Sequence, residues 1–256
     1  MDWVPDFYAK QYDWADWLHR WGDFDPDSAD LRVDAVTRHA GSGRLRILEL
    51  GSGTGTSAAA LATAGHDVVA IELQYELAAH TQELAAGVTG GSLRAIPGDF
   101  YEIEPPGPFD VVGYFDGFGI GSDEDQRRLL RRIAGWLTPD GCALVDVLVP
   151  WYWARQAGSE EEFPTGSRVR YLDGFDAQGC RMTERMWRVG HESEGVTQSL
   201  RCYSPPDLGL LLEGTGLSIR DIEPFTDETY GTPCDVADAM LYLAVLTPAC
   251  GRPRRA

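Results

Sequence analysis

The sequence contains a single lysine, Lys10, and few basic residues of any kind. Lysine and arginine together number 22 against 40 aspartates and glutamates, which gives a formal charge of −18 at pH 7. Such a chain repels phosphate backbones at a distance, so we expect no nucleic-acid partner. Because Lys10 lies outside any tyrosine–lysine motif, the sequence also disfavours an NAD-dependent oxidoreductase that relies on such a pair.

Long apolar runs are also absent. No stretch of eighteen apolar residues occurs, and the first residues lack the basic and hydrophobic regions of a secretory signal. We therefore expect no membrane partner and a cytoplasmic protein. The five cysteines are scattered without Cys-x-x-Cys spacing, and the histidines show no metal spacing, which predicts reduced thiols and no bound metal. Nothing in the sequence indicates an oligomeric state.

The stretch 44–57 is the centre of the chain. An apolar strand over 45–50 enters a glycine turn, and an alanine-rich helix over 57–64 follows. The turn carries Gly51, Gly53 and Gly55. Bare glycines let a ligand approach backbone amides and permit positive φ, so the turn predicts a nucleotide pocket. A dinucleotide fingerprint would have its third glycine where Thr56 stands, which again disfavours NAD.

An acidic residue, Glu49, precedes the glycines. The run Glu49-Leu-Gly-Ser-Gly-Thr-Gly55 resembles the first motif of the class I S-adenosylmethionine-dependent methyltransferases. In that family the loop holds the methionine half of the cofactor. The resemblance therefore implies S-adenosyl-L-methionine as cofactor, bound by Glu49 and by the three glycines of the turn.

Two later segments fit the same family. A second buried strand ends at Glu72, 21 positions after Gly51, where a carboxylate can accept hydrogen bonds from both ribose hydroxyls. The third strand leads to Asp99, at a place where the family commonly has an acidic residue that accepts from the adenine amino group. Leu73 and Phe100 are then expected on the two faces of the adenine ring.

The fourth predicted strand, 109–115, brings Phe115 and Asp116 to the carboxyl edge of the sheet, where ligands of parallel sheets collect. We expect Phe115 to contact the cofactor. Asp116 either contacts the methyl acceptor or holds the loop backbone. Asp116 and His191 are the candidate catalytic bases, although the position of His191 in a predicted turn favours a surface histidine.

After a buried strand at 142–149, the aromatic residues Trp151 and Tyr152 either wall an acceptor pocket or fill the core. An alternating pattern then predicts three antiparallel strands, over 167–172, 180–189 and 196–203. Six arginines of this insertion are candidates to receive an anionic acceptor group, but nearby acidic residues nearly balance them. These arginines are Arg168, Arg170, Arg181, Arg185, Arg188 and Arg201.

The N-terminal segment is aromatic and acidic. At helical spacing, one stripe predicts a core contact and comprises Phe7, Trp14, Trp17, Leu18 and Trp21. The other side carries Tyr8, Tyr12, Asp13, Asp16 and Arg20. In many small-molecule methyltransferases an N-terminal helical segment closes over the cofactor, so Tyr8 and Tyr12 either line that site, through hydrogen bonds or cation–π contact, or are solvated.

The resemblance implies an α/β fold: a Rossmann-like, seven-stranded, mostly parallel sheet with helices on both faces, plus an N-terminal helical lid and an antiparallel β insertion. We divide this single domain into the lid (1–43), the cofactor-binding core (44–150), the substrate-side insertion (151–203) and the C-terminal part of the core (204–256). The implied function is methyl transfer to a nitrogen or oxygen atom of a small-molecule acceptor in specialised metabolism. A noncatalytic cofactor-binding module and a C-methyltransferase are the alternatives.

Overall fold

The computed structural model describes residues 3–14, 26–163, 168–226 and 232–249. Several residues of the predicted N-terminal helix faces lie outside these ranges, namely Asp16, Trp17, Leu18, Arg20 and Trp21. The C-terminal tail from residue 250 onward lies outside them as well.

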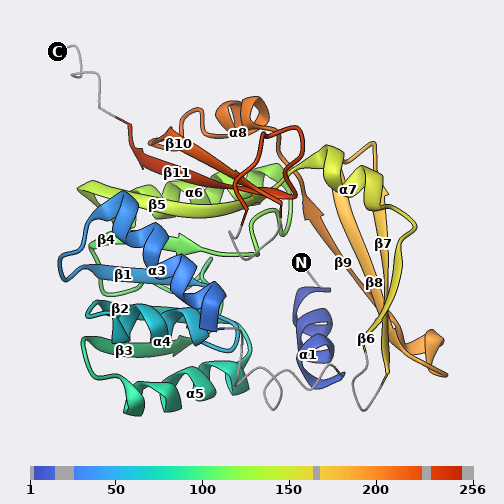
Figure 1. The fold of residues 1–256 in the computed structure, drawn as a ribbon, viewed down its shortest axis with the longest axis horizontal. Coiled ribbons are helices and arrows are strands. Elements are labelled where there is room, and N and C mark those ends of the chain that lie inside the picture. Colours follow the sequence, from blue (N-terminus) through green and yellow to red (C-terminus); the bar gives the residue numbers. More distant parts are fainter. Residues whose placement is uncertain (1–2, 15–25, 164–167, 227–231, 250–256) are drawn as a thin grey trace.

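The larger of two sheets has seven strands in the order β10-β11-β5-β4-β1-β2-β3 (Figure 1). Its strands are β1 (Arg46–Leu50), β2 (Asp67–Glu72), β3 (Ser92–Pro97), β4 (Phe109–Tyr114), β5 (Leu137–Leu148), β10 (Leu217–Phe225) and β11 (Leu241–Pro248). β1 to β5 pair in parallel, and β11 runs antiparallel to both of its neighbours. This arrangement confirms the predicted Rossmann-like sheet.

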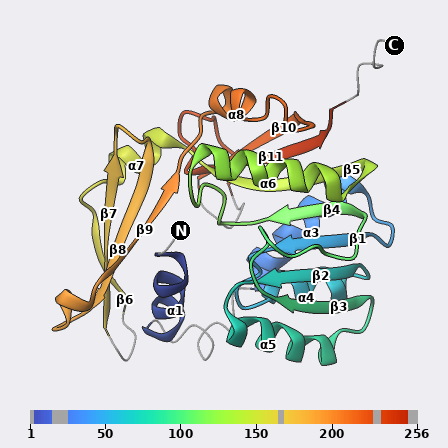
Figure 2. The ribbon, with the colours of Figure 1, turned by 180° about the vertical axis from the view of Figure 1, so that it is seen from behind.

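Helices cover both faces of this sheet (Figure 2). One face packs against α3 (Pro26–Ala40), α4 (Thr56–Thr63) and α5 (Tyr75–Leu84), which the short 3₁₀ turn η1 (Ala85–Gly87) follows. The other face packs against α6 (Asp123–Trp136) and α8 (Pro205–Leu211). Successive side chains of a strand point to opposite faces of the sheet, so the strands contribute to two core layers. In β1, Ile47 packs on the side of α3 and α4, and Leu48 packs on the side of α6 and α8.

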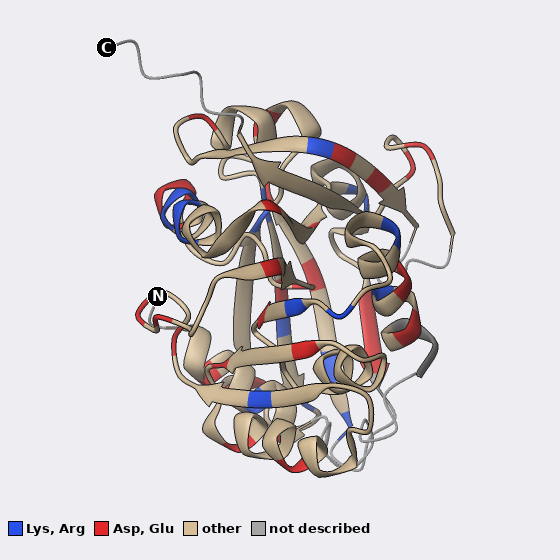
Figure 3. Cartoon of the chain, turned by 90° about the vertical axis from the view of Figure 1, so that its left-hand side faces the viewer, with Lys and Arg blue, Asp and Glu red and all other residues tan. Residues whose placement is uncertain are grey.

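Local capping signals start two of these helices. Ser122 and Asp125 form a reciprocal capping box at α6, and Ser204 and Asp207 form another at α8. Three of the four arginines of α6 pair with acidic residues, as Arg128 does with Glu102 at 2.6 Å, whereas Arg127 donates to the backbone of α8. Acidic positions are spread over the whole ribbon beside the fewer basic ones (Figure 3).

The loop before β5 differs from the expectation. The sequence suggests a turn over 137–141, but β5 begins at Leu137, so this prediction is wrong. Leu137 pairs with Phe109 of β4, and an irregularity between Phe109 and Val111 absorbs the Pro-Asp-Gly sequence. A helix that the sequence did not predict, α7 (Pro150–Gln156), follows β5 and carries the aromatic residues expected there.

The second sheet is antiparallel and has four strands, β6 (Glu160–Phe163), β7 (Val169–Asp176), β8 (Arg181–Arg188) and β9 (Val196–Arg201), with the 3₁₀ turn η2 (Glu192–Glu194) before β9. The last three correspond to the predicted insertion. β6 is an additional edge strand, in which Glu160 and Glu162 pair with Arg170 of β7 at 2.7 and 3.2 Å. β7 also continues past residue 172, where the predicted strand ends, and includes Gly174, which pairs with Thr183 of β8 and packs closely against its side chain.

Helix α1 (Val4–Trp14) lies between the two sheets (Figures 1 and 2). Its buried side chains Phe7 and Trp14 pack with Val169, Tyr171 and Met186 of the second sheet in a small apolar cluster. The apolar stripe is therefore confirmed for these two residues. The second sheet and α1 form one unit with its own core.

The described cysteines are free thiols, as expected, and two of them, Cys142 and Cys202, are buried. No helix in the described part of the chain is long and apolar enough to cross a membrane.

The turn into β3 depends on Gly91. A Cβ atom added there would lie 1.9 Å from the backbone oxygen of His66, so Gly91→Ala must push the start of β3 away from the loop before β2. We expect a loss of about 1–3 kcal/mol in the free energy of unfolding, measured by urea titration. Gly87→Ala is the matched control, because nothing lies within 4 Å of its Cβ position. Equal stability of the two variants would contradict this packing.

Candidate functional site

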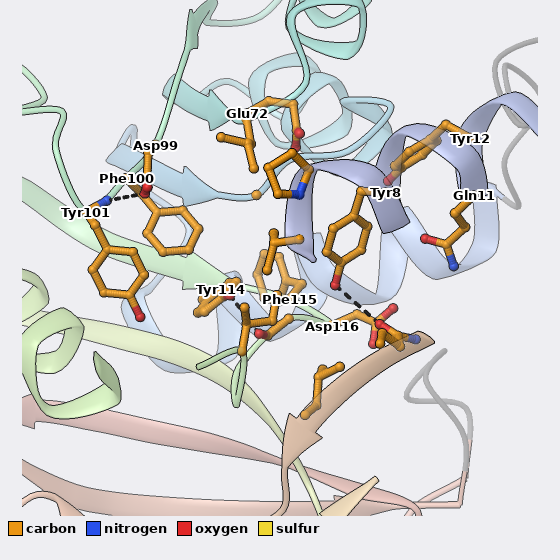
Figure 4. A pocket seen from close by; sticks show the side chains of 18 of the residues that line it. Tyr8, Gln11, Tyr12, Glu72, Asp99, Phe100, Tyr101, Tyr114, Phe115 and Asp116 are labelled. Atoms are coloured by element: carbon orange, nitrogen blue, oxygen red, sulfur yellow. Dashed lines mark hydrogen bonds between the residues drawn. The ribbon is translucent and has the colours of Figure 1, made fainter. Parts of the chain in front are cut away.

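A pocket of about 260 Å³ opens at the carboxyl edge of the larger sheet, close to the lower end of the range for small-molecule sites (Figure 4). Two predicted residues line it from α1, Tyr8 and Tyr12. Seven others line it from the larger sheet and its loops, namely Gly51, Glu72, Leu73, Asp99, Phe100, Phe115 and Asp116. The structure thus brings most of the predicted site residues together.

Further lining residues were not found from the sequence. Tyr101 comes from the turn after β3 and Tyr114 from β4, and Met182, Gln198 and Leu200 come from the second sheet. The last three residues carry no local sequence motif. They reach the pocket only because β8 and β9 pack against the loop after β4.

The glycine turn has the geometry that the sequence predicts. Gly51, Gly53 and Gly55 have φ of 62°, 53° and 82°, a region that other residues seldom adopt. A Cβ atom on Gly53 would lie 2.6 Å from the hydroxyl oxygen of Tyr12. Helix α1 therefore closes directly over the turn, and a side chain at position 53 would displace it.

Glu72 joins the glycine turn to the end of β2. Its side chain is buried, and its two oxygens each accept a backbone N–H at 2.8 Å, Oε2 from Gly53 and Oε1 from Gln74. Burial raises the pKa of Glu72, and these backbone bonds oppose that effect. Because a carboxylate oxygen can accept more than one hydrogen bond, both oxygens keep the capacity to bind a ligand hydroxyl.

Glu49 is a buried carboxyl beside the turn. Its Oε2 has no hydrogen-bond partner although the residue is only 3% exposed. Burial raises the pKa of Glu49 to about 7, with nearby Arg32 opposing this effect and Glu72 adding to it. Leaving a buried acceptor unbonded costs stability, so the position suits a ligand that donates a hydrogen bond.

Arg32, on α3, lies beside the pocket without lining it, and sequence reasoning missed it. Its guanidinium donates to the hydroxyl of Ser57 at 2.6 Å and lies 5.0 Å from the ring centre of Phe115. Arg32 lies far from the glycine turn in the chain and carries no motif, so only the packing of α3 on α4 indicates its place. Together, Glu49 and Arg32 put opposite charges beside the turn.

An aromatic wall forms the opposite end of the pocket. The ring of Phe100 lies 5.0 Å from that of Tyr101 and 5.4 Å from that of Tyr114, measured between ring centres. The carboxylate of Asp99 is exposed and accepts the N–H of Tyr101 at 2.8 Å. Leu73 is also exposed. Flat apolar surfaces beside an accessible carboxylate suit a ring that carries an amino group.

A third part of the pocket lies between β4 and the second sheet. Asp116 lines it from the end of β4 with its own N–H bonded to Asp146 at 3.0 Å. Across from it, Tyr8 donates to the side-chain oxygen of Gln198 at 3.4 Å, and Gln198 donates to Glu184 at 3.1 Å. Burial raises the pKa of Tyr8 and Tyr12 well above the usual range, so both phenols stay protonated near pH 7.

Three predicted residues lie elsewhere. His191 is exposed in the turn between β8 and β9, where its Nδ1 lies 3.1 Å from Glu194. Trp151 and Tyr152 do not line the pocket; they pack on the core, and the indole N–H of Trp151 donates to the backbone of Val236. Glu49, Gly53 and Gly55 are also not among the residues that line the pocket, although Gly53 and Gly55 belong to the glycine turn and Glu49 directly precedes it in β1.

Among the described residues, one group of side chains has atoms arranged closely enough to hold a metal ion: His39, Asp221 and Glu223. None of them lines the pocket. Glu223 is already paired with Arg38 at 2.7 Å and with His39 at 2.9 Å, so charge on this carboxylate is balanced within the protein.

With this geometry in view, residues 47–141 match the family model described as a methyltransferase domain. This match covers less than half of the chain. A stretch of 124 residues is also 32% identical to the cypemycin N-terminal methyltransferase of a Streptomyces species, and covers 47% of this chain and 49% of that protein. The chain thus spans about half the length of the curated relative it matches.

Solved structures share the whole fold. The CcbJ methyltransferase from Streptomyces caelestis has a TM-score of 0.72 at 22% identity, and the alignment covers 92% of this chain and 96% of that one. The glycopeptide N-methyltransferase MtfA, solved with S-adenosyl-L-methionine, has a TM-score of 0.58 at 19% identity over 87% of this chain and 94% of that one. At these identities the likeness establishes a common fold.

The methyltransferase domain supplies only part of the pocket. Gly51, Glu72 and Asp116 belong to the matched segment, whereas Tyr8 and Gln198 come from α1 and β9 outside it. One end of the pocket is therefore built by the methyltransferase domain and the other is shared with the rest of the chain.

The buried carboxyl of Glu49 predicts a pH-dependent stability. Folding raises its pKa from the ordinary 4.5 to about 7, so between these values the native state keeps a proton that the unfolded chain has lost. This contribution to stability is complete below pH 4.5 and is lost as the pH rises through 7. The free energy of unfolding of the wild type should therefore fall by about 3 kcal/mol as the pH rises from 4.5 to 7. The variant Glu49→Gln should not show this fall.

Urea titrations at pH 4.5, 6 and 8 measure this difference. Glu83→Gln, which changes an exposed glutamate of α5, is the control and should keep the wild-type dependence. A constant stability difference between the wild type and Glu49→Gln at all three pH values would show that Glu49 is not the group responsible.

Proposed function

We propose that the protein transfers the methyl group of S-adenosyl-L-methionine to a nitrogen or oxygen atom of a small-molecule acceptor in specialised metabolism. The observation that carries this proposal is the buried, unbonded Oε2 of Glu49 beside a turn of three positive-φ glycines. The names of the relatives support it, since one is an N-terminal methyltransferase of cypemycin and another is a glycopeptide N-methyltransferase that binds this cofactor.

The residues present fit the cofactor chemically. Glu49 and Arg32 offer opposite charges to its amino-acid end, and charge-assisted hydrogen bonds of this kind are strong. Glu72 would accept from the ribose hydroxyls while it remains bonded to the turn. Phe100 and Leu73 would contact the adenine ring, and Asp99 would accept from its amino group.

Bound S-adenosyl-L-methionine supplies a methyl group on a positively charged sulfur. The task of the chain is to align an acceptor atom with that methyl group and to exclude water, and orientation alone can lower a barrier by roughly 7–11 kcal/mol. Tyr8 and Tyr12 present aromatic rings that suit a neighbouring positive charge. A base is needed for a hydroxyl acceptor, and Asp116 is the carboxylate placed for it; a neutral amine can lose its proton after transfer.

Closure over the pocket is part of the proposal. Helix α1 docks on the second sheet and reaches the larger sheet through a hydrogen bond from Gln74 to the backbone of Pro5 at 3.0 Å. We assign segment 1–43 to a lid and segment 151–203 to the substrate side within a single domain. The contact of Tyr12 with the glycine turn supports this division.

Cofactor binding tests the site. Glu72→Gln should weaken S-adenosyl-L-methionine at least tenfold in calorimetric titration, because it removes a charged acceptor worth roughly 1.5–3 kcal/mol per hydrogen bond. Gly53→Arg should abolish binding, because the new side chain meets the hydroxyl of Tyr12 at a residue with φ of 53°. Glu76→Gln, on the exposed side of α5, is the control. Wild-type affinity in both test variants would reject the assigned site.

The activity requires a separate measurement, in which the protein is incubated with methyl-labelled cofactor and an extract of the organism that makes it. Label should appear in a small molecule, bound to nitrogen or oxygen. Tight cofactor binding with no labelled product, from the extract or from a panel of amines, phenols and acids, would favour a noncatalytic binding module. Label on carbon would favour a C-methyltransferase.

A further inference from the structure

We infer that His80, on α5, is a positioning residue that fixes one peptide of the glycine turn in the orientation to which the cofactor binds. This inference rests on the proposed function and adds to it a residue outside the pocket lining. Three observations carry it: a hydrogen bond from α5 to the turn, the conformational freedom of the glycine beside that bond, and a close contact made by the next residue of α5.

The hydrogen bond joins His80 to the middle of the turn. The Nδ1 atom of His80 lies 2.9 Å from the backbone oxygen of Thr54, the residue between Gly53 and Gly55. Because a carbonyl oxygen only accepts hydrogen bonds, Nδ1 carries the hydrogen and donates it. A neutral histidine with its hydrogen on Nδ1 and a histidine cation both make this bond, so the bond does not depend on the charge of the ring.

Both ends of the peptide between Thr54 and Gly55 are bonded. Its oxygen accepts from His80, and its N–H, which belongs to Gly55, donates to the oxygen of Ser52 at 2.8 Å. Gly55 has a φ of 82°, but a glycine adopts negative φ as readily, so sterics alone do not hold this peptide. Two hydrogen bonds keep its orientation, and His80 supplies the one that comes from outside the turn.

A close contact brings His80 to this position. The next residue of α5, Thr81, is fully buried, and a Cβ atom on Gly55 would lie 2.3 Å from its hydroxyl oxygen. The absence of a side chain on Gly55 therefore lets α5 approach the turn closely enough for His80 to bond Thr54. The hydroxyl of Thr81 makes no hydrogen bond of its own, so within this pair of neighbours His80 alone bonds the turn.

The orientation of this peptide matters because the proposed function places the amino-acid end of the cofactor beside the turn, near Glu49 and Arg32. A turn whose peptides change orientation presents a different set of N–H groups and oxygens to that end. When only a fraction of the molecules has the binding orientation, the apparent affinity falls by that fraction. His80 thus raises the affinity for the cofactor without touching it.

Two substitutions at position 80 test this role by calorimetric titration of the full chain with S-adenosylhomocysteine. His80→Ala removes the donor and should weaken binding about three- to tenfold, the range expected for the net loss of one ordinary hydrogen bond. His80→Asn carries an amide N–H at the same number of bonds from the backbone as Nδ1. This variant should bind within about twofold of the wild type.

A matched control lies on the same helix. Gln82→Ala removes another hydrogen bond from a side chain of α5 to the backbone, in this case to the N–H of Ala95 in β3 at 3.0 Å. If loss of any such bond loosened α5 and thereby weakened binding, Gln82→Ala would weaken it as well. We expect this control to bind S-adenosylhomocysteine like the wild type.

A second ligand separates positioning of the turn from a general effect on the pocket. 5′-Methylthioadenosine keeps the adenine and ribose of S-adenosylhomocysteine but lacks its amino-acid end. His80→Ala should therefore change the affinity for 5′-methylthioadenosine less than about twofold, whereas a general loosening of the pocket would weaken both ligands equally.

Wild-type affinity for S-adenosylhomocysteine in His80→Ala would overturn the inference. So would an equal loss in His80→Asn, an equal loss in Gln82→Ala, or an equal loss for both ligands in His80→Ala. Failure of the wild type to bind S-adenosylhomocysteine would instead reject the proposed function on which this role depends.

Discussion

The close backbone contact between Gly119 and Arg201 is the constraint on which the acceptor end of the pocket depends. The N–H of Arg201 donates to the oxygen of Gly119 at 2.8 Å, and a Cβ on Gly119 would lie 2.4 Å from the oxygen of Arg201. Arg181 reinforces this junction through backbone oxygens on both sides. Without it, β8 and β9 would not be held against the end of β4, and the pocket would have only its cofactor end.

A comparable constraint holds the cofactor end, but it is local in sequence. The bond from Gly53 to Glu72 connects the ends of two adjacent parallel strands, and both residues belong to segments with recognisable motifs. A parallel sheet brings the carboxyl ends of its strands to one edge by its topology. The cofactor end is therefore set largely by the backbone, whereas the acceptor end is set by side chains from three separate parts of the chain.

This difference explains what the sequence predicted. The glycine turn and Glu72 follow from periodicity and spacing, because each signal lies within a few residues of the feature it describes. The seven-stranded sheet, Asp99 and Phe100 follow from the resemblance to a known family, which those local motifs made recognisable. Arg32, Met182 and Gln198 carry no such signal, since only tertiary packing brings them near the pocket. His191 lies in a turn, as predicted, but this turn is at the end of the β8–β9 hairpin that does not line the pocket. Sequence spacing alone does not indicate which end of a long hairpin faces a site.

The two ends of the pocket also differ in what substitution can change. The glycine turn, with φ values of 53° to 82°, accepts few other residues, so its chemistry is nearly fixed. The side chains of β8, β9 and α1 lie on regular elements that tolerate many residue types if their packing is preserved. Changes there can alter the charge and shape offered to an acceptor without disturbing the turn. Asp116 stands where the two parts meet. Its N–H is bonded to Asp146 of the larger sheet, and it lines the pocket together with Met182 and Gln198 of the second sheet. The backbone of Asp116 is therefore set by the larger sheet, whereas the surface of the pocket beside it is set by side chains of β8 and β9.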